Sequence, residues 1–155
     1  MSKVETVAEA AIGEYQETAA DYQLDDQIGF ILRLASQRHV SIFQNLSPGG
    51  LTPTQFATLI RVVEMGECSQ NHLGRMVSMD VATIKGVVDR LKKKGLVRLA
   101  PDLNDKRRTT ITPSDTAKQM VGELHELGLR ISEETMQPLT AKERATLMRL
   151  LRKII

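Results

Sequence analysis

Basic side chains are concentrated between residues 80 and 113 of this 155-residue chain. This segment holds nine Lys and Arg residues against four Asp residues, whereas residues 1–30 hold one Lys against seven Asp and Glu residues. Lysine and arginine pair with phosphate oxygens, and a cluster of them attracts a polyanion. The charge distribution therefore indicates that the second segment meets a nucleic acid. The alternative is an ordinary solvated basic surface.

The elements that would position these charges are a helix-turn-helix and a two-stranded wing. Residues 80–94 predict a helix that is capped by Asp80 and ends before a left-handed Gly95. Its expected apolar stripe consists of Val81, Ile84, Val88 and Leu91. Residues 69–76 predict a shorter helix capped by Ser69, joined to the next helix by a brief link. Two strands, at residues 96–100 and 109–112, enclose a basic turn.

Taken in order, these motifs resemble the MarR family of bacterial winged-helix transcriptional regulators. The matching features are GLTPTQF at residues 50–56, the helix-turn-helix, KKKGLVRL at residues 92–99, and a D-x-R motif at Asp105 and Arg107. The resemblance runs from Leu24 to the C-terminus. Gly86 departs from it, because this position of the recognition helix is often polar or basic in the family.

The resemblance implies a mainly α fold, with a winged helix-turn-helix, a small β wing, and N- and C-terminal helices that form a dimerisation region. We expect residues 1–23 to be an N-terminal arm or weak helix. Residues 24–47 and 114–155 are expected to form the helical dimerisation region, and residues 52–113 the DNA-binding lobe.

The terminal segments also carry more apolar side chains than one small winged domain needs. The stripe expected in the first long helix is Ile28, Leu32, Ala35, Ile42, Phe43 and Leu46, and that of the last helix is Leu147, Leu150, Leu151 and Ile154. This excess favours burial against a second copy, and the resemblance implies a homodimer. Two recognition helices would then read half-sites of a palindromic operator in double-stranded DNA, about 34–36 Å apart.

Three side chains of the recognition helix are predicted to contact DNA. Thr83 and Lys85 lie on its exposed early part, where base edges or nearby groups are read. Arg90 is expected to hold a phosphate. For each of them the alternative is an ordinary solvated residue.

The wing and the preceding helix are expected to add contacts to the DNA backbone. Arg107 and Arg108 at the wing tip should reach the minor groove or its phosphates. Asp105 is expected to orient Arg107. The start of the preceding helix offers phosphate contacts from Ser69, Gln70 and Asn71.

Basic residues on the first long helix predict a site for a small effector. Arg33 lies in the apolar stretch FILRLA, where a guanidinium needs an anion, and Arg38 and His39 follow it. His72 could reach the same cleft from the short helix. Such groups suit a small aromatic or aliphatic carboxylate. The alternatives are an Arg paired with an acid across the dimer and a His satisfied in the core.

Other functional classes receive little support from the sequence. Redox sensing would depend on Cys68, the single cysteine, but Glu64 and Glu67 disfavour its thiolate. The three histidines are scattered and lack the spacing of metal ligands, so we expect no metal and no cofactor. Nucleophile elbows, phosphate loops and dinucleotide fingerprints are absent, which argues against an enzyme.

The chain has no apolar run near the ~20 residues of a membrane span and no signal peptide, so a cytoplasmic location is expected. The sequence therefore predicts a dimeric, sequence-specific DNA-binding regulator, a repressor on the family's precedent, that a small effector releases from its operator. A second alternative, besides the redox sensor, is a winged-helix adaptor that binds protein.

Overall fold

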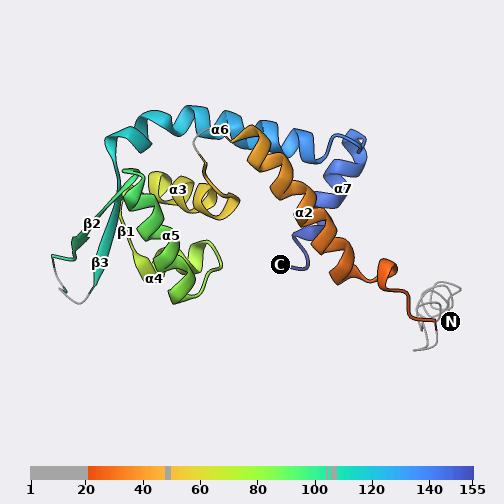
Figure 1. Ribbon diagram of the computed structural model, residues 1–155, viewed down its shortest axis with the longest axis horizontal. Helices are drawn as coiled ribbons and strands as arrows, with labels where there is room; N and C mark the ends of the chain where they lie inside the picture. The colour runs from red at the N-terminus through yellow and green to blue at the C-terminus, as the bar shows by residue number, and fades with distance from the viewer. Residues whose placement is uncertain (1–20, 48–49, 104, 106–107) are drawn as a thin grey trace, which may run out of the picture. The chain divides into compact units, whose positions relative to one another are not determined.

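The computed structural model describes residues 21–47, 50–103, 105 and 108–155 (Figure 1). Most of the predicted N-terminal arm, residues 1–20, therefore lies outside the described residues. The chain divides into one unit that ends at Ser36 and a second that begins at Gln37. The described part of the first unit holds the 3₁₀ turn η1 (Leu24–Asp26) and the start of helix α2 (Ile28–Leu46).

The second unit contains the rest of α2 and a winged helix-turn-helix. Its elements, in chain order, are α3 (Pro53–Met65), β1 (Cys68–Ser69), α4 (Gln70–Met76), α5 (Val81–Lys93), β2 (Val97–Pro101), β3 (Thr109–Pro113), α6 (Asp115–Thr135) and α7 (Ala141–Leu151). The mainly α fold with a small β wing is confirmed.

Five helices begin at a hydroxyl or carboxylate side chain that accepts a hydrogen bond from a backbone N–H three residues later. These N-caps are Thr52, Ser69, Asp80, Ser114 and Thr140. Such a cap satisfies a backbone donor that the helix itself cannot pair. Because the signal is local, the caps at Ser69 and Asp80 were predictable from the sequence.

The end of α5 was also predicted correctly. Gly95 has φ of +71°, the left-handed conformation that glycine adopts without strain. Its N–H donates to the carbonyl of Lys92 at 2.9 Å, and the N–H of Leu96 donates to the carbonyl of Leu91 at 3.0 Å. This pair of bonds is a Schellman motif, and it turns the chain from the helix into β2.

The sheet has three antiparallel strands in the order β1-β3-β2. Strand β2 pairs with β3 from Val97 opposite Pro113 to Pro101 opposite Thr109, which confirms the predicted wing. Strand β1 pairs Cys68 with Ile111 on the other side of β3. The sequence did not predict β1, because two residues are too few to show an alternating pattern.

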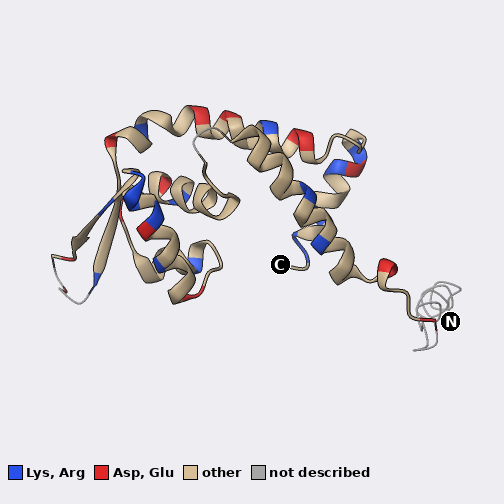
Figure 2. Cartoon of the chain, in the orientation of Figure 1, with Lys and Arg blue, Asp and Glu red and all other residues tan. Residues whose placement is uncertain are grey.

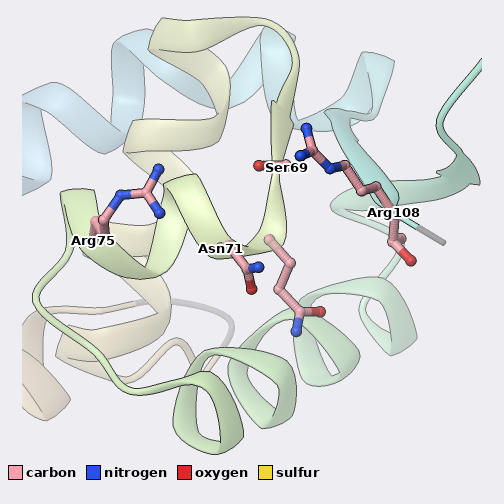
Figure 3. A pocket seen from close by; sticks show the side chains of 6 residues that line it. Ser69, Asn71, Arg75 and Arg108 are labelled. Atoms are coloured by element: carbon pink, nitrogen blue, oxygen red, sulfur yellow. The ribbon is translucent and has the colours of Figure 1, made fainter. Parts of the chain in front are cut away.

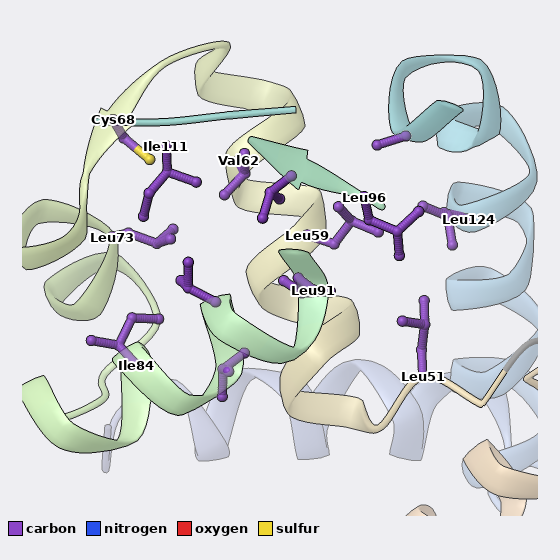
Figure 4. Close-up of a cluster of buried hydrophobic side chains, with 14 residues drawn as sticks. Leu51, Leu59, Val62, Cys68, Leu73, Ile84, Leu91, Leu96, Ile111 and Leu124 are labelled. Atoms are coloured by element: carbon purple, nitrogen blue, oxygen red, sulfur yellow. The ribbon is translucent and has the colours of Figure 1, made fainter. Parts of the chain in front are cut away.

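One apolar core joins α3, α4, α5 and the sheet (Figure 4). Leu59, Leu73, Leu91 and Ile111 are fully buried in it. The predicted stripe of α5 needs a correction, because Val81 is 65% exposed and Val87 is buried. The buried block is Ile84, Val87, Val88 and Leu91, the i, i+3, i+4, i+7 spacing of one helix face. Val81 lies one turn before this block.

The apolar stripes predicted for the terminal helices are largely exposed in the single chain. Of the stripe expected in α2, Phe43 is buried, whereas Ile28 is 64% and Leu32 40% exposed. Helix α7 has no buried residue. Ile154, which follows this helix, is 64% exposed. The described residues of one chain therefore do not bury these apolar side chains.

The turn between α4 and α5 depends on Gly74. A Cβ at this position would lie 3.1 Å from the carbonyl oxygen of Met79 and 3.3 Å from Cγ2 of Ile84. The Met79 N–H donates to the Gly74 carbonyl at 2.8 Å, so the backbone has little room to retreat. Gly74 therefore sets how closely the two helices approach.

We expect Gly74→Ala to lower the free energy of unfolding by about 1 to 2 kcal/mol, because the added methyl group overpacks this turn. Urea denaturation measures the change. The control is Gly122→Ala on α6, where no atom lies within 4 Å of the new Cβ and the free energy of unfolding should rise by about 1 kcal/mol. Equal stabilisation by both substitutions would contradict this role of Gly74.

Candidate nucleic-acid interface and ligand pocket

The first turn of α5 is held by a double hydrogen bond between Asp80 and Thr83. The Thr83 N–H donates to Oδ1 of Asp80 at 2.8 Å, and the Thr83 hydroxyl donates to Oδ2 at 2.6 Å. These bonds hold the pKa of the Asp80 carboxyl below its usual value, and the bond from the Thr83 hydroxyl has the larger effect. Thr83 is exposed, and its hydroxyl hydrogen is already used. Toward a DNA base, this oxygen is therefore an acceptor.

Lys85 and Arg90 are exposed on the same helix. Figure 2 shows that α5 carries several basic residues. The guanidinium of Arg90 lies over Gly86, with Nη1 3.5 Å and Nη2 3.7 Å from the place where a Cβ of Gly86 would be. The structure thus brings the three predicted side chains of α5 onto its solvent-exposed surface.

A polar pocket of about 280 Å³ lies between the start of α4 and the wing (Figure 3). Its lining consists of Ser69, Gln70, Asn71, Arg75, Arg108 and Thr109. Four of these residues were predicted as DNA contacts from two separate segments, and the fold places them around one space. Two guanidinium groups with hydroxyl and amide groups between them suit a phosphate, which accepts charged and neutral hydrogen bonds.

Two residues of this pocket, Thr109 and Arg75, were not predicted from the sequence, and of the two Arg75 carries the charge. It lies on α4 four residues after Asn71, so the two share a helix face. Its Nη2 lies 3.4 Å from Nδ1 of His72. Helical spacing from the predicted contact at Asn71 was the signal that could have found it.

The described part of the wing contains an ion pair. The Arg108 Nε lies 3.5 Å from Oδ2 of Asp105, and the Asp105 N–H donates to Oδ1 of Asp102 at 3.1 Å. Asp105 therefore contacts Arg108. Arg107, which the sequence analysis paired with Asp105, lies outside the described residues.

A second, mostly apolar pocket of about 540 Å³ lies among α2, α3 and α6. Its walls include the rings of Phe43 and Phe56, which meet edge to face at 5.4 Å between centroids. The polar side chains on its lining are His39, His125 and Ser132. Apolar walls with a few polar groups are typical of a site for a small organic ligand.

In a neutral His39 ring, the hydrogen bond to Thr135 decides which nitrogen carries the hydrogen. The Thr135 hydroxyl donates its single hydrogen to the carbonyl of Ile131 at 2.7 Å, and its oxygen lies 2.9 Å from Nδ1 of His39. The threonine oxygen must therefore accept from His39, which places the ring hydrogen on Nδ1. In the neutral imidazole, Nε2 is then left as an acceptor.

The other three predicted effector residues are not among those that line this pocket. Arg38 is exposed, and its Nη1 donates to the carbonyl of Thr135 at 2.6 Å. Arg33, in the first unit, lies over the ring of Phe30 at 5.0 Å. His72 lies on α4 beside Arg75, and α4 contributes no residue to the apolar pocket. Of the four, the pocket lining includes His39; the sequence analysis missed His125 and the two phenylalanines.

The thiol of Cys68 is buried in the core beside Ile111. Burial, and then the carboxylate of Glu67, raise the pKa of this thiol. Both effects oppose the reactive thiolate that a redox sensor needs. Among the described residues, no three His, Cys, Asp or Glu side chains are grouped as metal ligands, and no helix is long and apolar enough to cross a membrane.

This chain has clear relatives among known proteins and matches a known protein family. The family model of the MarR family matches residues 51–109. Over 135 residues the chain is 38% identical to the HTH-type transcriptional repressor NicR of Pseudomonas putida, a match that covers 86% of this chain and 85% of that protein. The chain belongs to the MarR family. It is therefore a transcriptional regulator from a family of DNA-binding proteins and not an enzyme.

Solved structures agree with this assignment. A probable transcriptional regulator from Pseudomonas aeruginosa is 46% identical with a TM-score of 0.82, covering 86% of this chain and all (100%) of that one. Bordetella bronchiseptica BpsR, whose DNA binding is regulated by 6-hydroxynicotinic acid, is 34% identical with a TM-score of 0.79, covering 86% of this chain and 96% of that one.

The buried state of Cys68 leads to a test of the redox alternative. Because the thiolate is the nucleophile and its formation is disfavoured here, we expect iodoacetamide to alkylate the native protein at least about tenfold more slowly than the urea-unfolded protein at pH 8. Mass spectrometry of timed samples measures both rates, and the single cysteine makes the signal unambiguous. Equal rates would revive the redox alternative.

Proposed function

We propose that this MarR-family member is a homodimeric repressor that binds a palindromic operator and leaves it when a small aromatic acid binds. The observation that carries the DNA-binding part is the polar pocket. Ser69, Asn71, Arg75 and Arg108 come from two segments and line one space, in which together they would hold one phosphate.

In this proposal the DNA contacts fall into two groups. Ser69, Gln70, Asn71, Arg75 and Arg108 hold phosphates and fix the position of the lobe on the duplex. Thr83 and Lys85 act at or near base edges in the major groove, where the early part of a recognition helix lies. Arg107 remains a proposed wing contact on the strength of the family resemblance.

Homodimerisation is supported by apolar side chains that one chain leaves exposed. Ile28, Ile31, Leu32 and Leu34 are exposed on α2, and Leu147, Leu150 and Ile154 are exposed at the C-terminal end. Each 100 Å² of apolar surface removed from water contributes roughly 2.5 kcal/mol. A second copy that covers these side chains would supply that free energy, and it would double the phosphate contacts.

The effector is proposed to occupy the apolar pocket of α2, α3 and α6. Its ring would lie among Phe43, Phe56 and Leu124, and a hydroxyl group on the ring would donate to Nε2 of His39. BpsR, a relative in sequence and structure, is regulated by 6-hydroxynicotinic acid, which has a ring of suitable size, a carboxyl group and a hydroxyl group. We therefore propose hydroxylated aromatic acids as the effector class.

Release of DNA requires that the effector bind one arrangement of the helices more tightly than the other. Thr135 on α6 receives hydrogen bonds from both Arg38 and His39 on α2. A ligand on His39 therefore acts directly on the junction of these two helices. Phe56 and Ile60 of α3 line the same pocket, so the ligand also contacts a helix of the DNA-binding lobe.

The DNA-binding proposal is tested by the salt dependence of affinity. We expect fluorescence anisotropy with the duplex upstream of the protein's own gene to give a steep negative slope of log K against log salt. Arg75→Gln should weaken binding to all sequences and reduce the slope by about 1, because one phosphate is no longer neutralised. Arg130→Gln on α6 is the charge-matched control and should change neither. A slope near zero in the unmodified protein would contradict the DNA-binding proposal.

The effector proposal is tested on His39. We expect 6-hydroxynicotinic acid, or a related hydroxylated aromatic acid, to release the duplex. His39→Ala should still bind DNA but require at least about tenfold more ligand, because the variant removes the polar partner of the bound acid. His72→Ala, a histidine outside the pocket, should respond to the ligand as the unmodified protein does. An unchanged ligand response in His39→Ala would remove this residue from the site.

A further inference from the structure

Gly86 and Arg90 form a pair on the outer face of the recognition helix. Arg90 lies four residues after Gly86, and its guanidinium Cζ is 3.9 Å from the place where a Cβ of Gly86 would be. Side chains of a helix lean toward its N-terminus, so Arg90 folds back along α5 by one turn, roughly 5.4 Å. Its donors therefore lie over the second turn of the helix, where Gly86 presents no side chain.

This position faces away from the core. Ile84, Val87, Val88 and Leu91 mark the buried side of α5. With about 100° per residue, Gly86 projects on the opposite side. Thr83 lies about one turn before it along the helix and Arg90 about one turn after it. The guanidinium thus lies over the outer face of α5, the face that a recognition helix turns toward base edges, whereas phosphates line the groove's edges.

No protein acceptor competes for this guanidinium among the described residues. Arg61, Arg98 and Arg108 each form an ion pair with a carboxylate of the chain. The Arg90 side chain is exposed and makes no hydrogen bond or ion pair within the described part of the chain. Its planar donors therefore remain available for an external acceptor, and two of them lie side by side as a bidentate contact requires.

We propose that Arg90 reads a guanine in the major groove through a bidentate hydrogen bond to O6 and N7, and that Gly86 gives it the room to do so. The inference rests on the proposed DNA-binding surface and changes the role of Arg90 from a phosphate contact to a determinant of sequence. Arginine and guanine form the commonest specific pair in protein–DNA complexes. The family often has a polar or basic residue at the position of Gly86. In this chain Arg90, one turn further along the helix, would supply that contact instead.

The test begins with a duplex selected by the unmodified protein from a random pool. Replacing each guanine in turn by 7-deazaguanine removes N7 and leaves the phosphates unchanged. At one guanine of each half-site, we expect affinity to fall by about 5- to 150-fold. Arg90→Lys keeps the charge but loses the planar fork, so it should bind guanine and 7-deazaguanine there within about twofold of each other, with its affinity for unrelated DNA retained.

Two further variants separate the guanidinium's position from its charge. Gly86→Leu fills the space under Arg90, so it should reproduce the loss of guanine preference although Arg90 is still present. Gly86→Ala places its Cβ at an ordinary contact distance of 3.5 Å from Nη1, so it should keep the preference. Lys92→Gln, at the end of the same helix, controls for loss of charge and should keep the preference as well.

The outcomes distinguish this inference from the proposed function. If Arg90→Lys keeps the full guanine preference of the unmodified protein at every position, the base contact is wrong, although the DNA-binding surface stands. If the unmodified protein selects no sequence and binds DNA without salt dependence, the proposed function itself fails, and this inference fails with it.

Discussion

Burial of one face of α5 is the constraint on which the DNA-binding surface depends. Ile84, Val87, Val88 and Leu91 are all at most 1% exposed in the core shared with α3, α4 and β3. Fully burying such a side chain contributes about 1.5 to 3 kcal/mol, so rotation of α5 about its axis would be very unfavourable. The exposed positions of Thr83, Lys85 and Arg90 are therefore consequences of the core. The same core holds Ile111 of β3, which fixes the base of the wing relative to the helix.

Helix α3 connects the two candidate sites physically. Leu59 and Val62 on one face are fully buried in the core of the lobe, while Phe56 and Ile60 line the apolar pocket on another face. A ligand that changes the packing around Phe56 acts on the helix against which α5 is packed. Because close-packed interiors transmit small displacements rather than absorb them, the proposed ligand would act through α3 on the position of the recognition helix without a separate signalling element.

Local features were predictable from the sequence, and features that depend on distant segments were not. Asp80 and Gly95 set the bounds of α5 through bonds to near neighbours, so residue type and spacing were sufficient. Strand β1, the place of Arg75 beside Arg108, and the hydrogen on Nδ1 of His39 all require groups brought together by the fold. Val81 was assigned to the buried stripe because spacing alone does not show where a packing partner ends. The apolar stripe of α2 was predicted, but the exposure of Ile28 reflects what a single chain leaves uncovered.

We infer that one lobe presents the starts of α4 and α5 and the root of the wing to DNA. The most direct measurement is an amide ¹H–¹⁵N NMR titration of the protein with a duplex that it binds. We expect the largest shifts on Ser69–Asn71, on the first turns of α5 and on Arg108–Thr109, with small changes in the core face of α3. Shifts confined to α7 or to the apolar pocket, with α5 unaffected, would contradict it.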